Sequence, residues 1–446
     1  MSQPVSRRVP NRQSVASTVA AATTKPTAAE ENSRGRALTI RNRSGRLRCR
    51  GLTPRTYHHR LRPHARCWPS PSRFDRVPIV ERRPEPRFDW FIPIDGDGEH
   101  IGTWRAERPP TFDYLRRVVE TAEAEGYYSL LIPTRFANGL FGETAPLAET
   151  WTTVTALAAV TRRIRFLVAI RPGFISTGLF AQMAAALDQI SGGRLDINVV
   201  PGGIQGDFER LGVTIDHDRR YEQGEEFIAA LRALWAKPEP VVFEGSTVRL
   251  KGAVVSPGPV AGGPRFYVGG ASPRALEFAA AGAEVYLAWI QPLDDIAKLL
   301  DRVRTAYRAR GHRPVFGLRT HLVVRATERD AWAAAEELMS RVDERVVAQR
   351  QSAFAGTPMV GQQAQLRAEL RERAPRLWNG ISKVRVNLGT AIVGDPEQVT
   401  AELAAYWRLG IDEFILSGFP HVEECRRVAS DVLPRLRAAI ERERLA

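Results

Sequence analysis

From Arg87 to the end of the chain, short apolar runs alternate with stretches of helical periodicity. Each run has the length of a buried strand. Strands that are apolar on both faces and separated by helices indicate a parallel sheet covered by helices. The eight runs are Phe88–Ile94, Tyr128–Pro133, Ile164–Ile170, Leu195–Val200, Arg265–Val268, Val285–Trp289, Val315–Val324 and Glu413–Ser417. The sequence therefore predicts an α/β fold, a closed (β/α)8 TIM barrel, with a doubly wound open sheet as the alternative.

Two connections are longer than a barrel needs. One insertion runs from Gly202 to Arg220 after the fourth strand, and the other from Val342 to Glu413 between the seventh and eighth strands. Active sites of such barrels lie at the carboxyl ends of the strands, so the second insertion would lie over the site. It is a candidate lid.

Positive charge is concentrated in residues 1–87. The chain has 64 basic and 50 acidic side chains, a balance of +14, but residues 1–87 hold 20 basic and 5 acidic ones, which leaves 44 and 45 in the rest. The body is therefore neutral, and no nucleic-acid partner is expected for it. Residues 1–87 also lack a periodic apolar pattern, which predicts a disordered basic extension before a globular domain over residues 88–446. A targeting peptide, an RNA-binding arm and translation from a start codon placed too early are the alternatives.

Cysteine, histidine and hydropathy exclude several further classes of protein. The three cysteines cannot build a disulfide framework or a zinc site, and the five histidines of the body form no closely spaced ligand pair, so no metal site is predicted. No apolar run approaches the roughly 20 residues of a membrane helix, so no membrane partner is expected. A reducing, cytoplasmic location is the expectation.

Arg319 and His321 lie two residues apart within the seventh apolar run, so on a strand they share one face. A buried guanidinium needs an anionic partner. These residues therefore favour a pocket for a phosphate, sulfonate or carboxylate, with His321 as an acid or base. The alternative is a strand with one solvated face.

A glycine turn, Gly269–Ser272, follows the fifth run and opens a helix. Its free N–H groups and the hydroxyl of Ser272 could hold a phosphate at the helix N-terminus. A tight strand-to-helix connection would have the same sequence.

Several motifs of the body are together similar to those of one enzyme family. They are Gly96–Gly98, Leu131–Thr134, Phe166–Pro172, Asp216–His217, Arg220–Glu222, Gly317–His321 and Leu416–Glu424. From about Phe88 to the C-terminus, the chain resembles the flavin-dependent alkanesulfonate monooxygenases of the bacterial luciferase-like superfamily.

The resemblance implies an FMN-dependent barrel enzyme that takes reduced FMN from a separate NAD(P)H-dependent reductase. The reduced flavin reacts with dioxygen, and the resulting flavin peroxide cleaves the carbon–sulfur bond of an alkanesulfonate to give an aldehyde and sulfite. A small organosulfur substrate and a homo-oligomeric assembly are implied as well. A lid would suit this chemistry, because the peroxide must be kept from water.

The resemblance also assigns site residues by position. Trp289, Arg319 and His321 match active-site residues of the family, and Arg385 matches the arginine of a mobile segment that closes over flavin and substrate. The FMN phosphate is expected near Gly270 and Ser272, with Asn198 and Tyr221 nearby.

Three positions depart from the family pattern. Leu147 stands in place of a cysteine, Phe419 in place of a tyrosine and Asp95 in place of a histidine. An added carboxylate would repel an anionic substrate unless it pairs with an arginine. The segment Thr134–Gly139 is similar to that of the sulfone monooxygenase branch, whose substrates are neutral, so a sulfone or another small molecule is an alternative substrate.

Two further hypotheses belong to other classes. A deazaflavin-dependent oxidoreductase of the same superfamily would transfer hydride and need no dioxygen. A non-enzymatic binder acting through the basic extension would lose its nucleic-acid affinity when residues 1–87 are removed.

Overall fold

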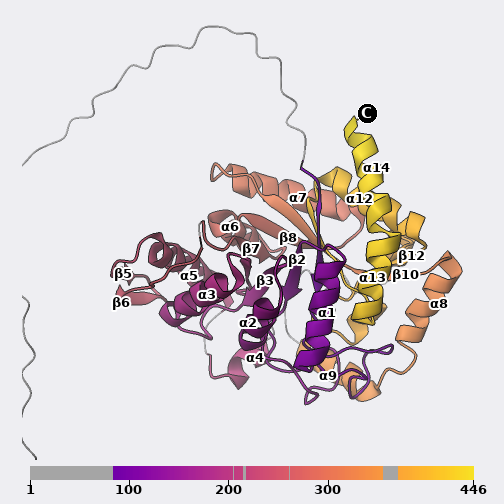
Figure 1. Cartoon of the computed structure of the whole chain (residues 1–446), viewed down its shortest axis with the longest axis horizontal. Coiled ribbons are helices and arrows are strands. Elements are labelled where there is room, and N and C mark those ends of the chain that lie inside the picture. Colours follow the sequence, from indigo (N-terminus) through magenta and orange to yellow (C-terminus); the bar gives the residue numbers. More distant parts are fainter. Residues whose placement is uncertain (1–83, 204, 214–216, 261, 355–369, 446) are drawn as a thin grey trace, which may run out of the picture. The chain divides into compact units, whose positions relative to one another are not determined.

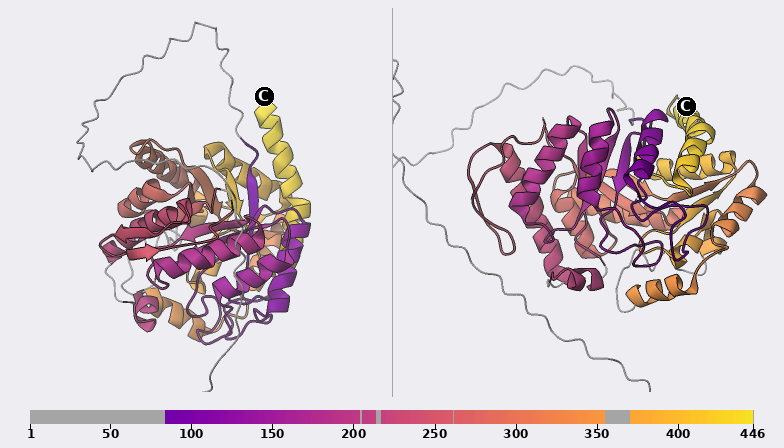
Figure 2. Two further views of the ribbon diagram at one scale, coloured as in Figure 1. Left: turned by 60° about the vertical axis from the view of Figure 1, so that its left-hand side comes forward. Right: turned by 60° about the horizontal axis from the view of Figure 1, so that its bottom comes forward.

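The computed structural model describes residues 84–445 apart from 204, 214–216, 261 and 355–369. In this part of the chain, eight parallel strands close into a barrel in the order β1-β13-β9-β8-β7-β4-β3-β2. Helices surround the strands (Figures 1 and 2). The barrel strands are β1 (Arg87–Phe91), β2 (Ser129–Ile132), β3 (Arg165–Ile170), β4 (Leu195–Val199), β7 (Phe266–Gly269), β8 (Val285–Trp289), β9 (Val315–Arg319) and β13 (Glu413–Ile415).

The predicted (β/α)8 barrel is confirmed, because each of the eight predicted runs overlaps one barrel strand. The open sheet is excluded, since β1 pairs with both β2 and β13 and so leaves no edge there. Apolar side chains of the strands point alternately to the helices and to the barrel interior. The interior cluster is small and consists of Phe91, Leu131, Leu167, Tyr267, Val285, Leu287 and Ile415.

The seventh predicted strand is two strands. β9 ends at Arg319, and the chain leaves the barrel at Thr320, whose N–H still donates to Ile415 O at 3.1 Å. The next residue begins β10 (His321–Val324), which pairs with β12 (Ala391–Gly394) in a separate sheet. The run Val315–Val324 is apolar on both sides of Arg319–His321, so its pattern does not reveal that the chain passes from one sheet to another.

A ring of helices covers the barrel. Helix α1 (Phe112–Ala124) shows why they form: Thr111 caps its first turn, and Leu115, Val118, Val119 and Ala122 recur at helical spacing and are all buried. Successive helices pack against one another around the ring. The others are α2 (Thr150–Val160), α3 (Thr177–Ser191), α5 (His217–Ala236), α6 (Pro273–Gly282), α7 (Leu293–Arg308), α12 (Pro396–Leu409), α13 (His421–Asp431) and α14 (Leu433–Leu445).

The insertion after β9 begins and ends earlier in the chain than predicted. It extends from His321 to Gly394, because α12 belongs to the ring and packs on α7 and α14. Its sheet has the order β10-β12-β11, and its own apolar cluster includes Ile101 and Phe141 from the loops after β1 and β2. Its other elements are α8 (Glu328–Leu338), α9 (Glu344–Phe354), α11 (Leu370–Arg373), β11 (Leu377–Trp378) and η1 (Gly380–Lys383).

Two elements between β4 and β7 were not predicted. The insertion after β4 contains the short helix α4 (Gln205–Arg210), and a hairpin of β5 (Val241–Glu244) and β6 (Arg249–Ala253) follows α5. The hairpin was missed because its strands are half-buried and charged, which weakens the apolar signal.

Most of the predicted basic extension, residues 1–83, lies outside the described residues. Within the described part of the chain, no helix is both long enough and apolar enough to cross a membrane.

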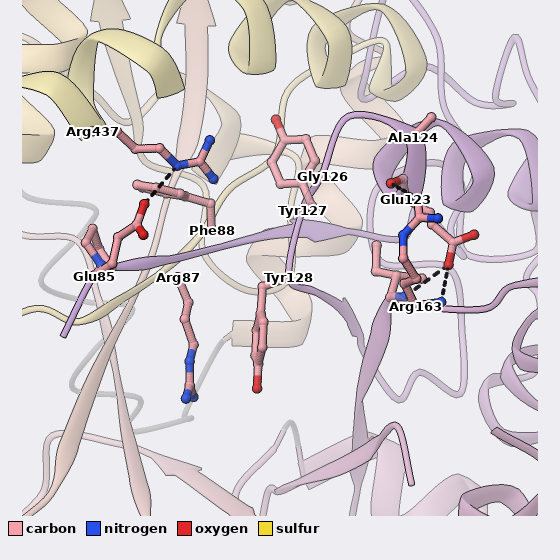
Figure 3. Close-up of a pocket in the computed structure, with 12 residues that line it drawn as sticks. Glu85, Arg87, Phe88, Glu123, Ala124, Gly126, Tyr127, Tyr128, Arg163 and Arg437 are labelled. Atoms are coloured by element: carbon pink, nitrogen blue, oxygen red, sulfur yellow. Dashed lines mark hydrogen bonds and ion pairs between the residues drawn. The ribbon is translucent and has the colours of Figure 1, made fainter. Parts of the chain in front are cut away.

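At the amino ends of β1 to β3 lies a hollow of about 460 Å³, lined by the residues drawn in Figure 3. The charged groups around it already have partners. Arg437 pairs with Glu85 at 3.3 Å, and Glu123 accepts hydrogen bonds from three successive backbone N–H groups, those of residues 162–164. The charges of Arg437, Glu85 and Glu123 are therefore engaged within the protein.

Next to this end, the barrel interior holds a buried cluster of charges. Asp89, Asp196 and Glu413 are each 0% exposed. Asp196 pairs with Arg165 at 2.9 Å and with Arg265 at 3.0 Å. Both carboxylate oxygens of Asp89 lack a hydrogen-bond donor among the described residues.

We expect the free energy of unfolding to fall as the pH rises through the pKa of Asp89. Burial raises this pKa well above 3.8, and the neighbouring Glu413 adds to the shift. A group whose pKa is raised by folding stabilises the fold while it is protonated, and this contribution is lost as it ionises. Urea denaturation between about pH 5 and about pH 9 should therefore show that the free energy of unfolding falls less steeply with pH for Asp89→Asn than for the parent protein.

The matched control is Asp113→Asn, which removes an exposed carboxylate at the start of α1. The control should keep the slope of the parent protein, and equal slopes in all three proteins would contradict the assignment.

Candidate active site

A cavity of about 300 Å³ opens at the carboxyl ends of the barrel strands. Seven barrel strands and the insertion segment 385–388 contribute to its lining. The structure brings together there seven of the eight predicted site residues, namely Asn198, Tyr221, Gly270, Ser272, Trp289, Arg319 and Arg385. His321 is the exception.

One side of the cavity is built to receive an anion on a helix N-terminus. Gly270 has a φ of +134°, and a Cβ there would lie 2.7 Å from the Cβ of Ala275. Ser272 caps α6, its Oγ accepting a hydrogen bond from Ala275 N at 3.2 Å. Asn198 and Tyr221 line the same side from β4 and α5. The helix dipole and the free N–H groups at this end favour a phosphate.

The opposite side carries two buried guanidinium groups. Arg319 and Arg385 are 5% and 3% exposed, and their Cζ atoms lie 4.5 and 5.0 Å from the ring centre of Phe91. Neither forms an ion pair with a carboxylate of the described chain, and Nε of Arg385 has no hydrogen-bond partner within it. This end of the cavity therefore has an excess of positive charge.

Burial and neighbouring positive charges weaken the protonation of both groups. Burial, with the charges of Arg385 and Arg135, lowers the pKa of Arg319 well below its usual value. Burial and Arg135 likewise lower the pKa of Arg385 to about 9. An anion bound between them would relieve this repulsion.

His321 lies behind Arg319 and does not line the cavity. Its Nδ1 lies 2.7 Å from Ser417 Oγ, and its Nε2 lies 3.1 Å from Leu388 O. Burial, followed by the charge of Arg319, lowers the pKa of His321 well below 6.5, so the imidazole is neutral. Both of its nitrogens are engaged by the protein.

The family of this chain follows from a sequence-profile match that covers most of its length. A sequence profile described as luciferase-like monooxygenase matches residues 87–413, which include all of the barrel strands up to the first residue of β13. The chain belongs to the luciferase-like monooxygenase family. The predicted relationship at the level of the superfamily is thus confirmed, and the chain is an enzyme of this family.

Solved structures with the same fold come from enzymes of different chemistry. Riboflavin lyase (RcaE), solved with modified FMN and riboflavin, is 20% identical with a TM-score of 0.65, covering 80% of this chain and 92% of that one. EDTA monooxygenase (EmoA) from Chelativorans sp. BNC1 is 18% identical with a TM-score of 0.63, covering 80% and 94%. An F420-dependent secondary alcohol dehydrogenase is 18% identical with a TM-score of 0.57, covering 79% and 99%. At these identities the likeness shows the fold alone.

Asp95 of this luciferase-like monooxygenase has the arginine partner that the sequence required. Its Oδ2 lies 3.1 Å from Nε of Arg135, and its Oδ1 accepts a hydrogen bond from Gly139 N at 2.6 Å. Although burial acts to raise the pKa of Asp95, Arg135 and Arg385 hold it below the usual value. The carboxylate is therefore ionised and forms its ion pair with Arg135, with no ion pair to Arg319 or Arg385 within the described chain.

Two residues that the sequence did not indicate hold the segment that carries Arg385. Asn387 accepts a hydrogen bond from Nη1 of Arg135 at 2.9 Å in the amide orientation that satisfies both of its polar atoms. Arg350 on α9 is 4% exposed and donates to Val384 O and Asn138 O, each at 3.0 Å. Backbone carbonyl partners leave no pattern in a sequence, so Arg350 had no signal by which to be found.

Phe419 and Leu147 are the other two positions at which this luciferase-like monooxygenase differs from the family pattern. The ring of Phe419 stacks on His321 with centroids 5.5 Å apart. Leu147 packs on the main hydrophobic core. Both substitutions put an apolar group where the family pattern has a reactive or polar one.

Proposed function

We propose that this luciferase-like monooxygenase uses reduced FMN and dioxygen to cleave the carbon–sulfur bond of an alkanesulfonate, releasing an aldehyde and sulfite. The observation that carries the proposal is the pair of buried guanidinium groups, Arg319 and Arg385, beside apolar walls. A sulfonate has three oxygens that share one negative charge, so both arginines can donate to it at once.

The residues at the other side of the cavity fit the phosphate of FMN. Ser272 and the N–H groups at the start of α6 would hold it, with Asn198 and Tyr221 alongside. Leu131, Ala169 and Leu287 offer an apolar surface between the two sides. When bound, reduced FMN supplies the electrons that activate dioxygen.

The residues of the chain then bind and orient the substrate. Arg319 and Arg385 would fix the sulfonate, which points the carbon chain toward the apolar walls and Trp289. Trp289 is level with Arg319 across β8 and β9. The insertion supplies one wall of the cavity through Arg385 and Leu388, and this wall would help to keep water from the reacting bond.

The proposal requires an NAD(P)H-dependent reductase as the source of reduced FMN. It places the activity in residues 88–446 and treats residues 1–87 as a basic extension that turnover does not need. A homo-oligomer and a cytoplasmic location remain part of the proposal.

The decisive experiment mixes the full chain with reduced FMN without oxygen, measures flavin binding by fluorescence, and then admits air in the presence of alkanesulfonates or dimethyl sulfone. We expect tighter binding of reduced than of oxidised FMN, and sulfite release that depends on reduced FMN. Product from dimethyl sulfone alone would move the substrate to the sulfone class. Failure to bind either flavin state would overturn the proposal.

The second candidate is a deazaflavin-dependent oxidoreductase, favoured by the structural likeness to the F420-dependent alcohol dehydrogenase. It predicts substrate turnover with reduced deazaflavin in the absence of dioxygen. The same assay with the deazaflavin in place of FMN separates the two candidates.

A further inference from the structure

Arg319 and Arg385 reach the cavity from different parts of the chain. Arg319 ends the barrel strand β9, and Arg385 lies in the insertion between η1 and β12. Two cations can hold one anion only when both are in place, so the relative position of these segments matters for binding. A chain of buried hydrogen bonds joins the segments directly.

This series of hydrogen bonds has three links. Nη2 of Arg319 donates to Oγ of Ser417 at 2.9 Å, Oγ of Ser417 lies 2.7 Å from Nδ1 of His321, and Nε2 of His321 lies 3.1 Å from Leu388 O. Arg319, His321 and Ser417 are 5%, 1% and 0% exposed. Leu388 follows Arg385 by three residues and lines the cavity with it.

The partners fix the direction of every hydrogen bond in this chain. A carbonyl can only accept, so Nε2 of His321 must carry the proton, and Nδ1 of a neutral ring is then an acceptor. The hydroxyl of Ser417 therefore donates to Nδ1, and its oxygen is free to accept from Arg319. These three hydrogen bonds leave no donor or acceptor among them unmatched. If the ring were protonated, its N–H at Nδ1 would face the hydroxyl proton of Ser417.

Apolar contacts and a backbone bond hold the ring of His321 in this orientation. Phe419 stacks on one face with an interplanar angle of 21°. His321 N donates to Thr390 O at 3.2 Å, so the backbone and the side chain of His321 both contact the stretch 388–390. The facing charged or titratable groups are Arg319, Arg385 and His421.

We propose that Ser417 and His321 are positioning residues that couple Arg319 to the segment carrying Arg385, so that both cations face one anion together. In this assignment His321 exchanges no proton with the substrate. The substrate itself rests on the proposed function, but the coupling does not, because it concerns only groups of this chain and any anion that the two arginines bind.

The test compares the full-length Ser417→Ala and Ser417→Thr variants with the Ser430→Ala control, which removes an exposed hydroxyl from α13. Methanesulfonate binding is followed by tryptophan fluorescence, and the histidine tautomer by NMR of ¹⁵N-histidine-labelled protein. We expect Ser417→Ala to weaken methanesulfonate binding by about tenfold and to remove the pure Nε2–H signature, because a hydrogen bond to a charged group is lost. Ser417→Thr should retain both the affinity for methanesulfonate and the Nε2–H signature of the parent.

A second variant separates positioning from proton transfer. His321→Gln keeps an amide that can donate toward Leu388 O, so we expect it to retain anion binding better than His321→Ala and to leave the pH profile of turnover unchanged. Loss of turnover with intact anion binding would instead make His321 an acid or base and overturn the proposal. So would an unchanged tautomer and affinity in Ser417→Ala. If no organosulfur compound is turned over, the proposed function fails while anion binding and NMR still test the coupling.

Discussion

Replacing Arg319 with methionine is expected to lower kcat/KM for the anionic substrate by about a thousandfold, which corresponds to roughly 4 kcal/mol. The reason is that Arg319 is one of three guanidinium groups that line the cavity in the described structure, with Arg171 and Arg385, and it is buried. Steady-state kinetics with saturating reduced FMN measures the loss. Affinity for reduced FMN should change little, since Ser272 and Asn198 line the other side.

The same variant should not lose stability. Arg319 has no carboxylate partner within the described chain, so its burial costs free energy that a methionine does not. We therefore expect an equal or higher Tm for Arg319→Met. Arg313→Met, which changes an exposed arginine before β9, is the matched control and should behave as the parent in both assays. Equal loss of flavin and substrate binding in Arg319→Met would contradict the division of the cavity into two sides.

The second large effect is expected at the other end of the barrel. Asp196→Asn should lower the free energy of unfolding by about 3–5 kcal/mol, because it leaves two largely buried guanidinium groups without their carboxylate. Asp196 is 0% exposed and contacts Arg165 at 2.9 Å and Arg265 at 3.0 Å. Urea denaturation near neutral pH measures the change.

A matched control is available at the surface. Asp301→Asn removes a carboxylate whose side chain is 76% exposed and which pairs with Arg304, and such pairs contribute little. Asp301→Asn should therefore unfold at nearly the urea concentration of the parent. If Asp196→Asn also unfolds at the urea concentration of the parent, the buried cluster does not stabilise the barrel.

Burial on both faces made the barrel predictable. Each strand lies in a mostly apolar run, and each run is followed by sequence of helical period, so the number and order of the strands could be read directly. The departure of the chain at Thr320 could not be read, because a strand that changes sheets keeps its apolar character. The hairpin β5–β6 was missed for the opposite reason, since its half-buried strands carry charges.

The candidate site was predictable to the extent that single residues reveal their chemistry. Arg319 stood out as a charge within an apolar run, and Asp95 as a carboxylate in need of an arginine. Ser417 was part of a recognised motif, but nothing in the sequence showed that its hydroxyl lies between Arg319 and His321. Such roles depend on contacts between residues about a hundred positions apart.

The two sides of the cavity come from separate stretches of the chain. The side suited to a phosphate is built from Asn198, Tyr221 and Gly270–Ser272, whereas the side with the excess positive charge uses Phe91, Arg319 and the insertion. Changes in the insertion can therefore alter which anion is accepted without touching the residues that would hold the flavin. We therefore expect that exchange of residues 321–394 between members of this family would change the substrate and leave the proposed flavin site unchanged.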